Sequence, residues 1–281
     1  MAEMDKKAEF GVVLTSGVTA GLAADVVLFP LDTLKTRLQS AEGFWRAGGV
    51  RGMYAGLASL ATGSMPSAAI FFCTYEGIKS LTSTSRNSGL QVVGGHMAAA
   101  MLAEVASLVV RVPCEVVKQR TQTLSNVSSW HVFQVTIKRQ GVTGLFQGYT
   151  STVMREVPFA LLQYPLWELF KKAWARHQGG STDPWQSAIC AGVAGGVSAG
   201  VTTPLDVAKT RIMLADLGTP LASSSLLYAL KTVNAERGIS GLFAGFIPRI
   251  ALMSLGGAMF LGTYDKIKDV MVNYNCYVHL F

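Results

Sequence analysis

Two adjacent charged residues, Arg155 and Glu156, stand inside an otherwise apolar run between residues 149 and 170. Ionisable side chains within a membrane-length apolar segment are costly, and they indicate a binding site or an ion path. A guanidinium beside a carboxylate could hold the α-carboxylate and the α-amino group of an amino acid. The alternative is an internal ion pair that only stabilises the protein.

Other residues could complete this site. Asp25 and Glu104 add negative charge that a neutral amino acid would not need, whereas a sulfonium or a second amine would. Phe71, Phe72 and Tyr164 could form a flat apolar wall for a purine, although core packing is the commoner use of such rings. The predicted substrate-binding residues are Arg155, Glu156, Asp25, Glu104, Phe71, Phe72, Gly63 and Arg249.

A signature of Pro, any residue, an acid, two residues, Lys, any residue and Arg occurs three times. The copies begin at Pro30, Pro113 and Pro204, so the chain repeats about every 90 residues. An acid and a Lys three residues apart lie on one helix face, so each acid could meet the Lys of a neighbouring repeat. The predicted ring of charges is Asp32, Lys35, Glu115, Lys118, Asp206 and Lys209.

Two further motifs keep the same phase. A Gly-x-aromatic-x-Gly segment ends at Gly56, Gly148 and Gly245. An aromatic residue, an acid, two residues and Lys then follow in each repeat. This motif predicts a second charged ring, made of Glu76, Lys79, Glu168, Lys171, Asp265 and Lys268. Three motifs in register establish a triplicated chain, and two opposed rings predict two gates.

The composition indicates a membrane protein. Half of the residues are hydrophobic and 15% are charged, against about 25% in soluble domains. The net charge of +7 comes without clustered basic and aromatic residues, so we expect no nucleic acid partner. The four cysteines have no paired spacing, which argues against a disulfide framework and a zinc site. We find neither a secretory signal nor an Arg-rich presequence at the N-terminus.

Six apolar runs are long enough to cross a bilayer as helices. They are residues 10–30, 57–75, 90–113, 149–170, 185–204 and 246–264, and each contains a proline that would bend it. Short surface helices are expected over 130–139 and 223–237, with a Gly-rich turn before Gly56 in the first repeat. We expect one membrane domain over 1–281, with repeats at 8–82, 90–175 and 184–272.

These three motifs in register resemble the mitochondrial carrier family over nearly the whole chain. The resemblance implies an all-α membrane protein of six kinked transmembrane helices in three pseudo-symmetric repeats, with short surface helices on the matrix side. It implies a monomeric carrier of the mitochondrial inner membrane that works by alternating access, contacts lipids, binds a small-molecule substrate and needs no cofactor or metal. The first ring then matches the matrix gate and the second the cytoplasmic gate. Gln39 and Gln122 match glutamine braces of the matrix gate, whereas Met213 departs from the pattern, so we expect this gate to open more easily.

Three functions remain as alternatives to a carrier whose substrate has an amino-acid head, a positive centre and a purine. A carrier of a basic amino acid such as ornithine would suit the same charges but would have no use for a purine wall. A membrane-embedded methyl-transferring enzyme is disfavoured, because no loop carries a glycine-rich cofactor motif, a nucleophile elbow or a metal-ligand cluster. A scaffold without transport would not need opposed charge rings, and it would tolerate charge reversal at Lys118.

Overall fold

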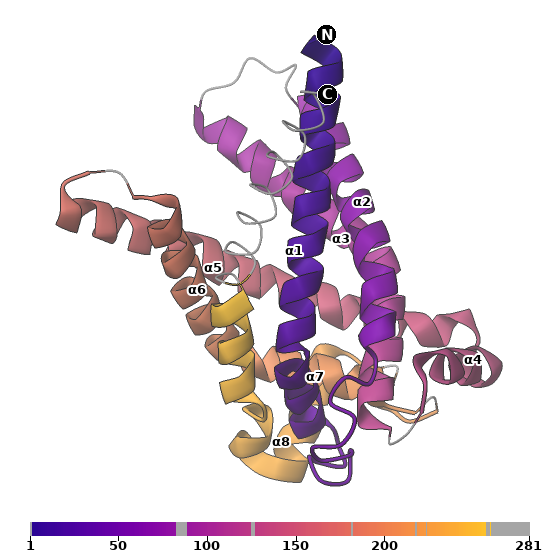
Figure 1. Ribbon diagram of the computed structural model, residues 1–281. Helices are drawn as coiled ribbons and strands as arrows, with labels where there is room; N and C mark the ends of the chain where they lie inside the picture. Colours follow the sequence, from indigo (N-terminus) through magenta and orange to yellow (C-terminus); the bar gives the residue numbers. More distant parts are fainter. Residues whose placement is uncertain are drawn as a thin grey trace. The chain divides into compact units, whose positions relative to one another are not determined.

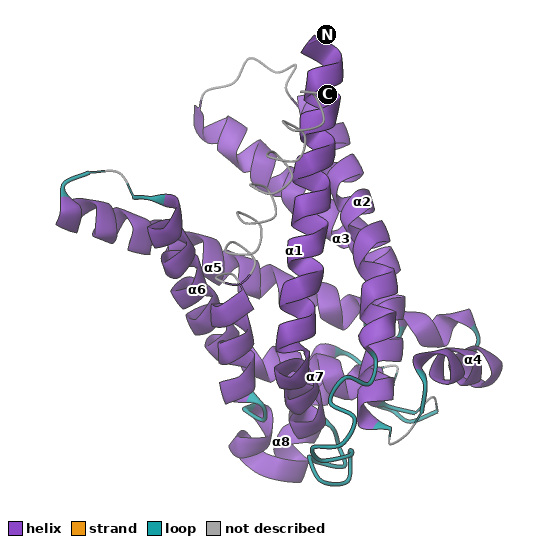
Figure 2. Ribbon diagram, viewed as in Figure 1, coloured by secondary structure: helices purple, strands orange, loops and turns teal. Residues whose placement is uncertain are grey.

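A computed structural model describes residues 2–82, 89–124, 127–180, 182–216, 218–222, 224–256 and 259. All regular structure in these residues is helical (Figure 2). The helices are α1 (Ala2–Gln39), α2 (Leu57–Thr82), α3 (Gly89–Thr123), α4 (Ser129–Gln140), the 3-10 helix η1 (Val142–Phe146), α5 (Tyr149–Gln178), α6 (Pro184–Val201), α7 (Thr203–Leu214), α8 (Leu226–Leu242) and a helix over Phe246–Gly256.

The chain divides into two compact units. Unit 1 comprises residues 1–35, 159–203 and 245–281, and unit 2 comprises residues 36–158 and 204–244. Unit 2 therefore contains α2, α3, α4, η1, α7 and α8, with the last turn of α1 and the first turns of α5. Most of the residues predicted for the matrix gate belong to unit 2.

Several helices reach the length that a membrane span requires, which is about 20 residues. Helices α1, α3 and α5 contain 38, 35 and 30 residues. Within the described ranges, Leu57–Ile78 alone is both long and apolar enough to count as a span by itself. Two broken pairs, Trp185–Val201 with Thr203–Leu214 and Leu226–Leu242 with Phe246–Gly256, would raise that number to three.

The signature prolines have different effects on the helices that contain them. Helices α1 and α3 continue through Pro30 and Pro113 without interruption (Figure 1). The expected helix over 185–204 instead ends at Val201, and Thr202 separates it from α7. Pro204 is the second residue of α7, a place that a proline tolerates because the first N–H groups of a helix have no intrahelical partner.

Both expected surface helices are confirmed. In α4 the Ser128 side chain accepts a hydrogen bond from the His131 N–H, and in α8 Ser225 accepts one from Tyr228. These bonds satisfy N–H groups that every helix start leaves without a partner. The regular part of α8 ends at Gly238, whose φ of 65° is outside the helical region, so the expected end at residue 237 is close.

In unit 2, α2 packs against α3, and Figure 1 shows the two helices side by side. A close approach occurs at Gly63, where an added Cβ would lie 2.7 Å from Cys114 Sγ. Ser59 in the same helix donates a hydrogen bond to the Cys114 carbonyl at 2.7 Å. The two contacts fix the register of α2 along α3.

Candidate substrate site and gates

The ion pair between Lys209 and Glu115 joins the third repeat to the second. Lys209 Nζ on α7 lies 2.6 Å from Glu115 Oε1 on α3, and the side chains are 4% and 21% exposed. Gln119, one turn further along α3, also donates to Glu115 Oε1, at 3.0 Å. The acid of one repeat thus meets the Lys of another, as the shared helix face predicts.

Asp206 meets a predicted brace from the first repeat. Gln39 Nε2 donates to Asp206 Oδ2 at 2.9 Å, and Thr210 Oγ1 donates to Gln39 Oε1 at 2.8 Å. All three residues are at most 3% exposed. Because both ends of the Gln39 amide are engaged, the side chain connects the end of α1 to α7 in a fixed orientation.

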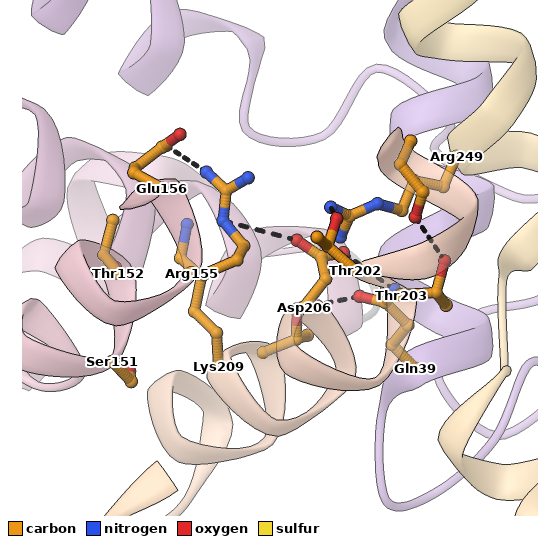
Figure 3. Close-up of polar contacts among 12 residues, drawn as sticks. Gln39, Ser151, Thr152, Arg155, Glu156, Thr202, Thr203, Asp206, Lys209 and Arg249 are labelled. Carbon is orange, nitrogen blue, oxygen red and sulfur yellow. Dashed lines mark hydrogen bonds and ion pairs between the residues drawn. The ribbon is translucent and has the colours of Figure 1, made fainter. Parts of the chain in front are cut away.

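Arg155 lies between Glu156 and Asp206, as Figure 3 shows. Its Nη2 forms an ion pair with Glu156 Oε1, and its Nε lies 3.7 Å from Asp206 Oδ1. The Arg155 side chain is 7% exposed. A residue predicted to bind the substrate is therefore in contact with an acid predicted to close the matrix gate.

Four other residues of the predicted matrix gate are placed less completely. Asp32 and Lys35 lie half-buried on α1 in unit 1, and Lys118 is half-buried on α3 in unit 2. Gln122, the second predicted brace, has a fully buried side chain near the end of α3. Their roles in a gate stay predictions.

The predicted cytoplasmic ring is described only in part. Within α5, Glu168 is 3.6 Å from Lys171 Nζ and 3.5 Å from Lys172 Nζ, and Lys171 also lies 4.0 Å from the centre of the Trp167 ring. Glu76 is exposed on α2. The side chain of Lys79 and the whole of Asp265 and Lys268 lie outside the described residues, so the second ring stays a prediction.

The acids predicted to meet a positive centre have different surroundings. Glu104 Oε1 lies 2.9 Å from Nη1 of Arg111, which is about two turns further along α3, and the two side chains are 34% and 49% exposed. Asp25 is half-buried on α1 in unit 1. Glu104 is therefore paired with a half-exposed arginine, a contact that the sequence did not predict.

Of the three aromatic residues predicted to form a wall, Phe71 and Phe72 lie on α2 of unit 2, and Tyr164 is exposed on α5 in unit 1. Their contact with a purine stays a prediction. Phe71 and Tyr75 stack with parallel rings whose centres are 6.3 Å apart, and Phe72 packs edge-on against Phe71 at 5.6 Å. The Phe72 side chain is 49% exposed. An exposed ring next to a stacked pair leaves an apolar face on which a flat ligand could lie.

The remaining two predicted binding residues have structural partners. Gly63 permits the close packing of α2 on α3 described above. Arg249, on the helix Phe246–Gly256 of unit 1, is completely buried, and its Nη2 donates to Thr202 Oγ1 at 2.8 Å. Since Thr202 separates α6 from α7, Arg249 supports the interruption of that span; its contact with a substrate stays a prediction.

Sequence reasoning missed the role of the signature arginines. Each donates through Nε to a backbone carbonyl at the end of another repeat's signature helix. The bonds run from Arg37 to the Gln122 carbonyl at 2.8 Å, from Arg120 to the Met213 carbonyl at 3.2 Å and from Arg211 to the Gln39 carbonyl at 2.8 Å. Carbonyls in the last turn of a helix lack intrahelical partners, so each arginine caps the helix of the next repeat. The recurrence of this arginine in all three copies of the motif could have indicated a shared structural role.

Comparisons with known proteins agree with this architecture. A family model described as "Mitochondrial carrier protein" matches residues 6–44, 40–86, 91–178 and 180–275. A protein of Danio rerio named mitochondrial S-adenosylmethionine carrier protein is 52% identical over 269 residues, which cover 96% of this chain and 100% of the relative. The protein of that name from Xenopus tropicalis is 50% identical over 267 residues, covering 95% of this chain and 98% of the relative. A Drosophila melanogaster protein, named S-adenosylmethionine mitochondrial carrier protein homolog, is 49% identical over 275 residues and 96% of each chain. The chain belongs to the mitochondrial carrier family.

Proposed function

We propose that this chain imports S-adenosylmethionine across the mitochondrial inner membrane into the matrix, in exchange for S-adenosylhomocysteine. It does so as a monomer, by alternating access between two gates. The observation that carries the proposal is the contact of Arg155 with both Glu156 and the gate acid Asp206. The relatives named above, about half identical over nearly the full length, support the choice of substrate.

The amino-acid head of the substrate fits the Arg155–Glu156 pair. A guanidinium can hold a carboxylate through two parallel hydrogen bonds, and a carboxylate can accept from an ammonium group. Binding replaces the ion pair between Arg155 and Glu156 by a bidentate contact of Arg155 with the ligand carboxylate and a contact of Glu156 with its ammonium group. Because both charges stay paired, the ligand does not leave a buried charge uncompensated, which would cost several kcal/mol.

The rest of the molecule has counterparts in this chain. The sulfonium needs a negative charge, which Glu104 or Asp25 supplies. At Glu104 the sulfonium displaces Arg111, whose side chain is half exposed and can turn to solvent. The adenine ring lies against Phe72 and the stacked pair of Phe71 and Tyr75.

Substrate binding opens the gate through Arg155. When the substrate carboxylate takes the guanidinium, the contact between Arg155 Nε and Asp206 is weakened, and Asp206 is held by Gln39. Exposed ion pairs contribute about 0.2–1 kcal/mol each, and more where water is excluded. A gate of a few such pairs is closed by a few kcal/mol, which a ligand can offset by binding the intermediate state more tightly.

The experiment that tests the proposal is uptake of labelled S-adenosylmethionine into liposomes that contain the purified chain. Internal S-adenosylhomocysteine should accelerate uptake, and liposomes without protein provide the baseline. Uptake that does not depend on the internal ligand would refute the exchange. Absence of S-adenosylmethionine uptake from protein that is folded would refute the substrate.

The second candidate is a carrier of a basic amino acid such as ornithine. The acids Asp25 and Glu104 favour it, because a side-chain amine would need one of them. The exposed Phe72 beside a stacked aromatic pair instead favours a substrate with a purine ring, such as S-adenosylmethionine. Uptake of ornithine or lysine in the same liposomes, with none of S-adenosylmethionine, would establish this alternative.

A further inference from the structure

The signature helix of the third repeat ends without a glutamine brace. Met213 on α7 occupies the position that Gln39 has on α1 and Gln122 has on α3. The Met213 side chain is completely buried in an apolar cluster. Its neighbours there are Leu108, Val112 and Val116. An apolar side chain in an apolar cluster cannot make the hydrogen bonds of an amide, so this helix needs another polar connection.

The contacts of Gln39 define what a brace does. Its amide donates to Asp206 and accepts from Thr210, and its backbone carbonyl accepts from Arg211 Nε. The side chain is thus buried, has both amide ends engaged and joins two repeats. A residue that replaces the missing brace should share these three properties.

Gln147 has all three properties. Its side chain is 7% exposed, and its Nε2 donates to the carbonyls of Ile212 at 2.6 Å and Ala215 at 2.8 Å. Its Oε1 accepts from Arg120 Nη2 at 2.8 Å, while Arg120 Nε holds the Met213 carbonyl. Since α7 ends at Leu214, these carbonyls belong to its last turn and the residue after it, where intrahelical donors run out.

The repeats provide an internal comparison. Gln147 is the fourth residue of the Gly-x-aromatic-x-Gly segment, and the same position is Ala55 in the first repeat and Ala244 in the third. The glutamine therefore occurs in a repeat whose segment contacts α7, the helix that lacks a brace. An alanine there could not reach the carbonyls.

We propose that Gln147 is the third brace of the matrix gate and replaces, from the second repeat, the glutamine absent at Met213. It is a positioning residue that holds the end of α7 against the second repeat. The inference rests on the proposed function only in taking this ring of contacts as a gate. The contacts of Gln147 also explain how the end of α7 stays attached to the second repeat although the third repeat lacks the signature glutamine.

A double-mutant cycle on the purified full-length chain, without substrate, tests this role. Gln147→Ala should lower the unfolding temperature by about 4 °C, because two hydrogen bonds to helix-terminal carbonyls are lost. Met213→Gln introduces an amide at the repeat position of Gln39. Because Gln39 donates to Asp206, the signature acid of another repeat, we expect the new amide to donate to the signature acid Glu115. In that background the loss caused by Gln147→Ala should shrink to about 2 °C or less. Gln134→Ala, at an exposed glutamine of α4, is the matched control and should leave the temperature unchanged.

Equal losses in both backgrounds would overturn the proposal. If Met213→Gln prevents folding, Gln147→Glu takes its place in the test. A carboxylate keeps an acceptor for Arg120 but cannot donate to the Ile212 and Ala215 carbonyls. It should therefore lower the unfolding temperature as much as Gln147→Ala does, and a wild-type temperature would contradict the brace.

A second readout separates a gate from a local stabilising contact. Thr152, which is 1% exposed, is replaced by Cys in a chain whose four native cysteines are changed to Ser, and its reaction with a soluble maleimide is timed. Gln147→Ala should raise this rate about fivefold or more, since weaker closure exposes the buried position more often. An unchanged rate would refute the brace. None of these measurements uses substrate, so failure of S-adenosylmethionine uptake would refute the transport proposal alone.

Discussion

At the scale of residues, the ion pair of Arg155 with Asp206 joins a residue proposed to bind the substrate to an acid proposed to close the matrix gate. The two groups lie 3.7 Å apart and are almost completely buried. Electrostatic interactions between buried charges are much less screened than those at the surface. A ligand that changes the partner of Arg155 therefore changes the surroundings of Asp206 directly, without a chain of intermediate contacts.

Replacement of Arg155 by Ala should abolish transport. We expect Arg155→Ala to lower the initial rate of uptake by about 100-fold, because a bidentate, charge-assisted contact with the substrate carboxylate is lost. Arg155→Lys keeps the charge without the planar fork and should retain an intermediate rate. The measurement is uptake into liposomes, with circular dichroism and thermal unfolding as tests of folding.

The matched control for this change is Arg139→Ala. Arg139 is exposed in the last turn of α4, so its loss should leave uptake unchanged. Retained uptake in folded Arg155→Ala protein would contradict the role of Arg155 in binding the head group.

The pair of Glu104 and Arg111 predicts a change in selectivity. Glu104→Gln should weaken inhibition of uptake by S-adenosylmethionine about tenfold and that by S-adenosylhomocysteine about twofold or less, because only the former has a sulfonium. Arg111→Gln should act in the opposite direction, since it frees the Glu104 carboxylate for the sulfonium. Competition with unlabelled ligand measures both. Equal weakening of the two ligands by Glu104→Gln would indicate a structural role for the acid.

How far single residues could be predicted depended on their repetition. The acids and lysines of the gates repeat in all three copies, and the pair of Lys209 and Glu115 follows from that pattern. The partners of the signature arginines are backbone carbonyls, which leave no mark on the sequence. The pairing of Glu104 with Arg111 was missed because both residues break the repeat, so comparison of the three copies gave no indication that they are partners.

At the scale of elements, the packing of α2 on α3 depends on a residue without a side chain. Gly63 Cα approaches Cys114 so closely that an added Cβ would lie 2.7 Å from both its Cβ and its Sγ. Real atoms do not approach so closely, so one helix would have to move. Protein interiors are close-packed, and such shifts spread to neighbouring contacts.

The substitution Gly63→Ala therefore tests whether Gly63 serves the packing of α2 on α3 or contacts the substrate. Overpacking typically costs about 1–3 kcal/mol, so we expect a lower unfolding temperature. Gly77→Ala on the same helix is the matched control: nothing lies within 4 Å of its added Cβ, and alanine favours a helix over glycine by about 1 kcal/mol. Thermal unfolding and uptake are measured together. A lower uptake rate with an unchanged unfolding temperature would favour the predicted contact of Gly63 with the substrate.

Elements were predictable where local signals agree. The expected surface helices over 130–139 and 223–237 lie close to the observed bounds of α4 and α8, and each observed helix begins at a serine cap. Prolines alone did not predict where a span is interrupted, because α1 and α3 continue through Pro30 and Pro113 whereas α6 ends before Pro204. The difference lies in tertiary contacts such as that of Arg249 with Thr202, which a local pattern does not contain.

At the scale of the whole molecule, triplication divides the residues into two classes. Those that repeat form the predicted gates and the arginine caps, and those that break the repeat form the predicted substrate site. The asymmetry extends to the gate itself, where the third repeat has Met213 and the second has Gln147. A threefold pseudo-symmetric carrier can thus have an asymmetric substrate site and still keep contacts between all three repeats.

The proposed exchange moves charge, which predicts a response to membrane potential. S-adenosylmethionine carries one net positive charge at neutral pH, from a sulfonium, an ammonium and a carboxylate, whereas S-adenosylhomocysteine carries none. Each import cycle therefore moves one positive charge inward, and a potential contributes about 2.3 kcal/mol per 100 mV for each charge. In liposomes with internal S-adenosylhomocysteine, a potassium diffusion potential that is negative inside should increase the accumulation of S-adenosylmethionine, by about 50-fold per 100 mV at equilibrium.

The control is the exchange of labelled for unlabelled S-adenosylmethionine, which moves no net charge and should not respond to the potential. Because this control uses the same protein, gates and ligand, it separates the charge of the counter-substrate from any effect of the field on the carrier. An exchange with S-adenosylhomocysteine that is equally indifferent to the potential would mean that another ion accompanies it. A response of both exchanges would place the field's action on charged residues of the carrier, such as Arg155 or the gate lysines, rather than on the transported solute.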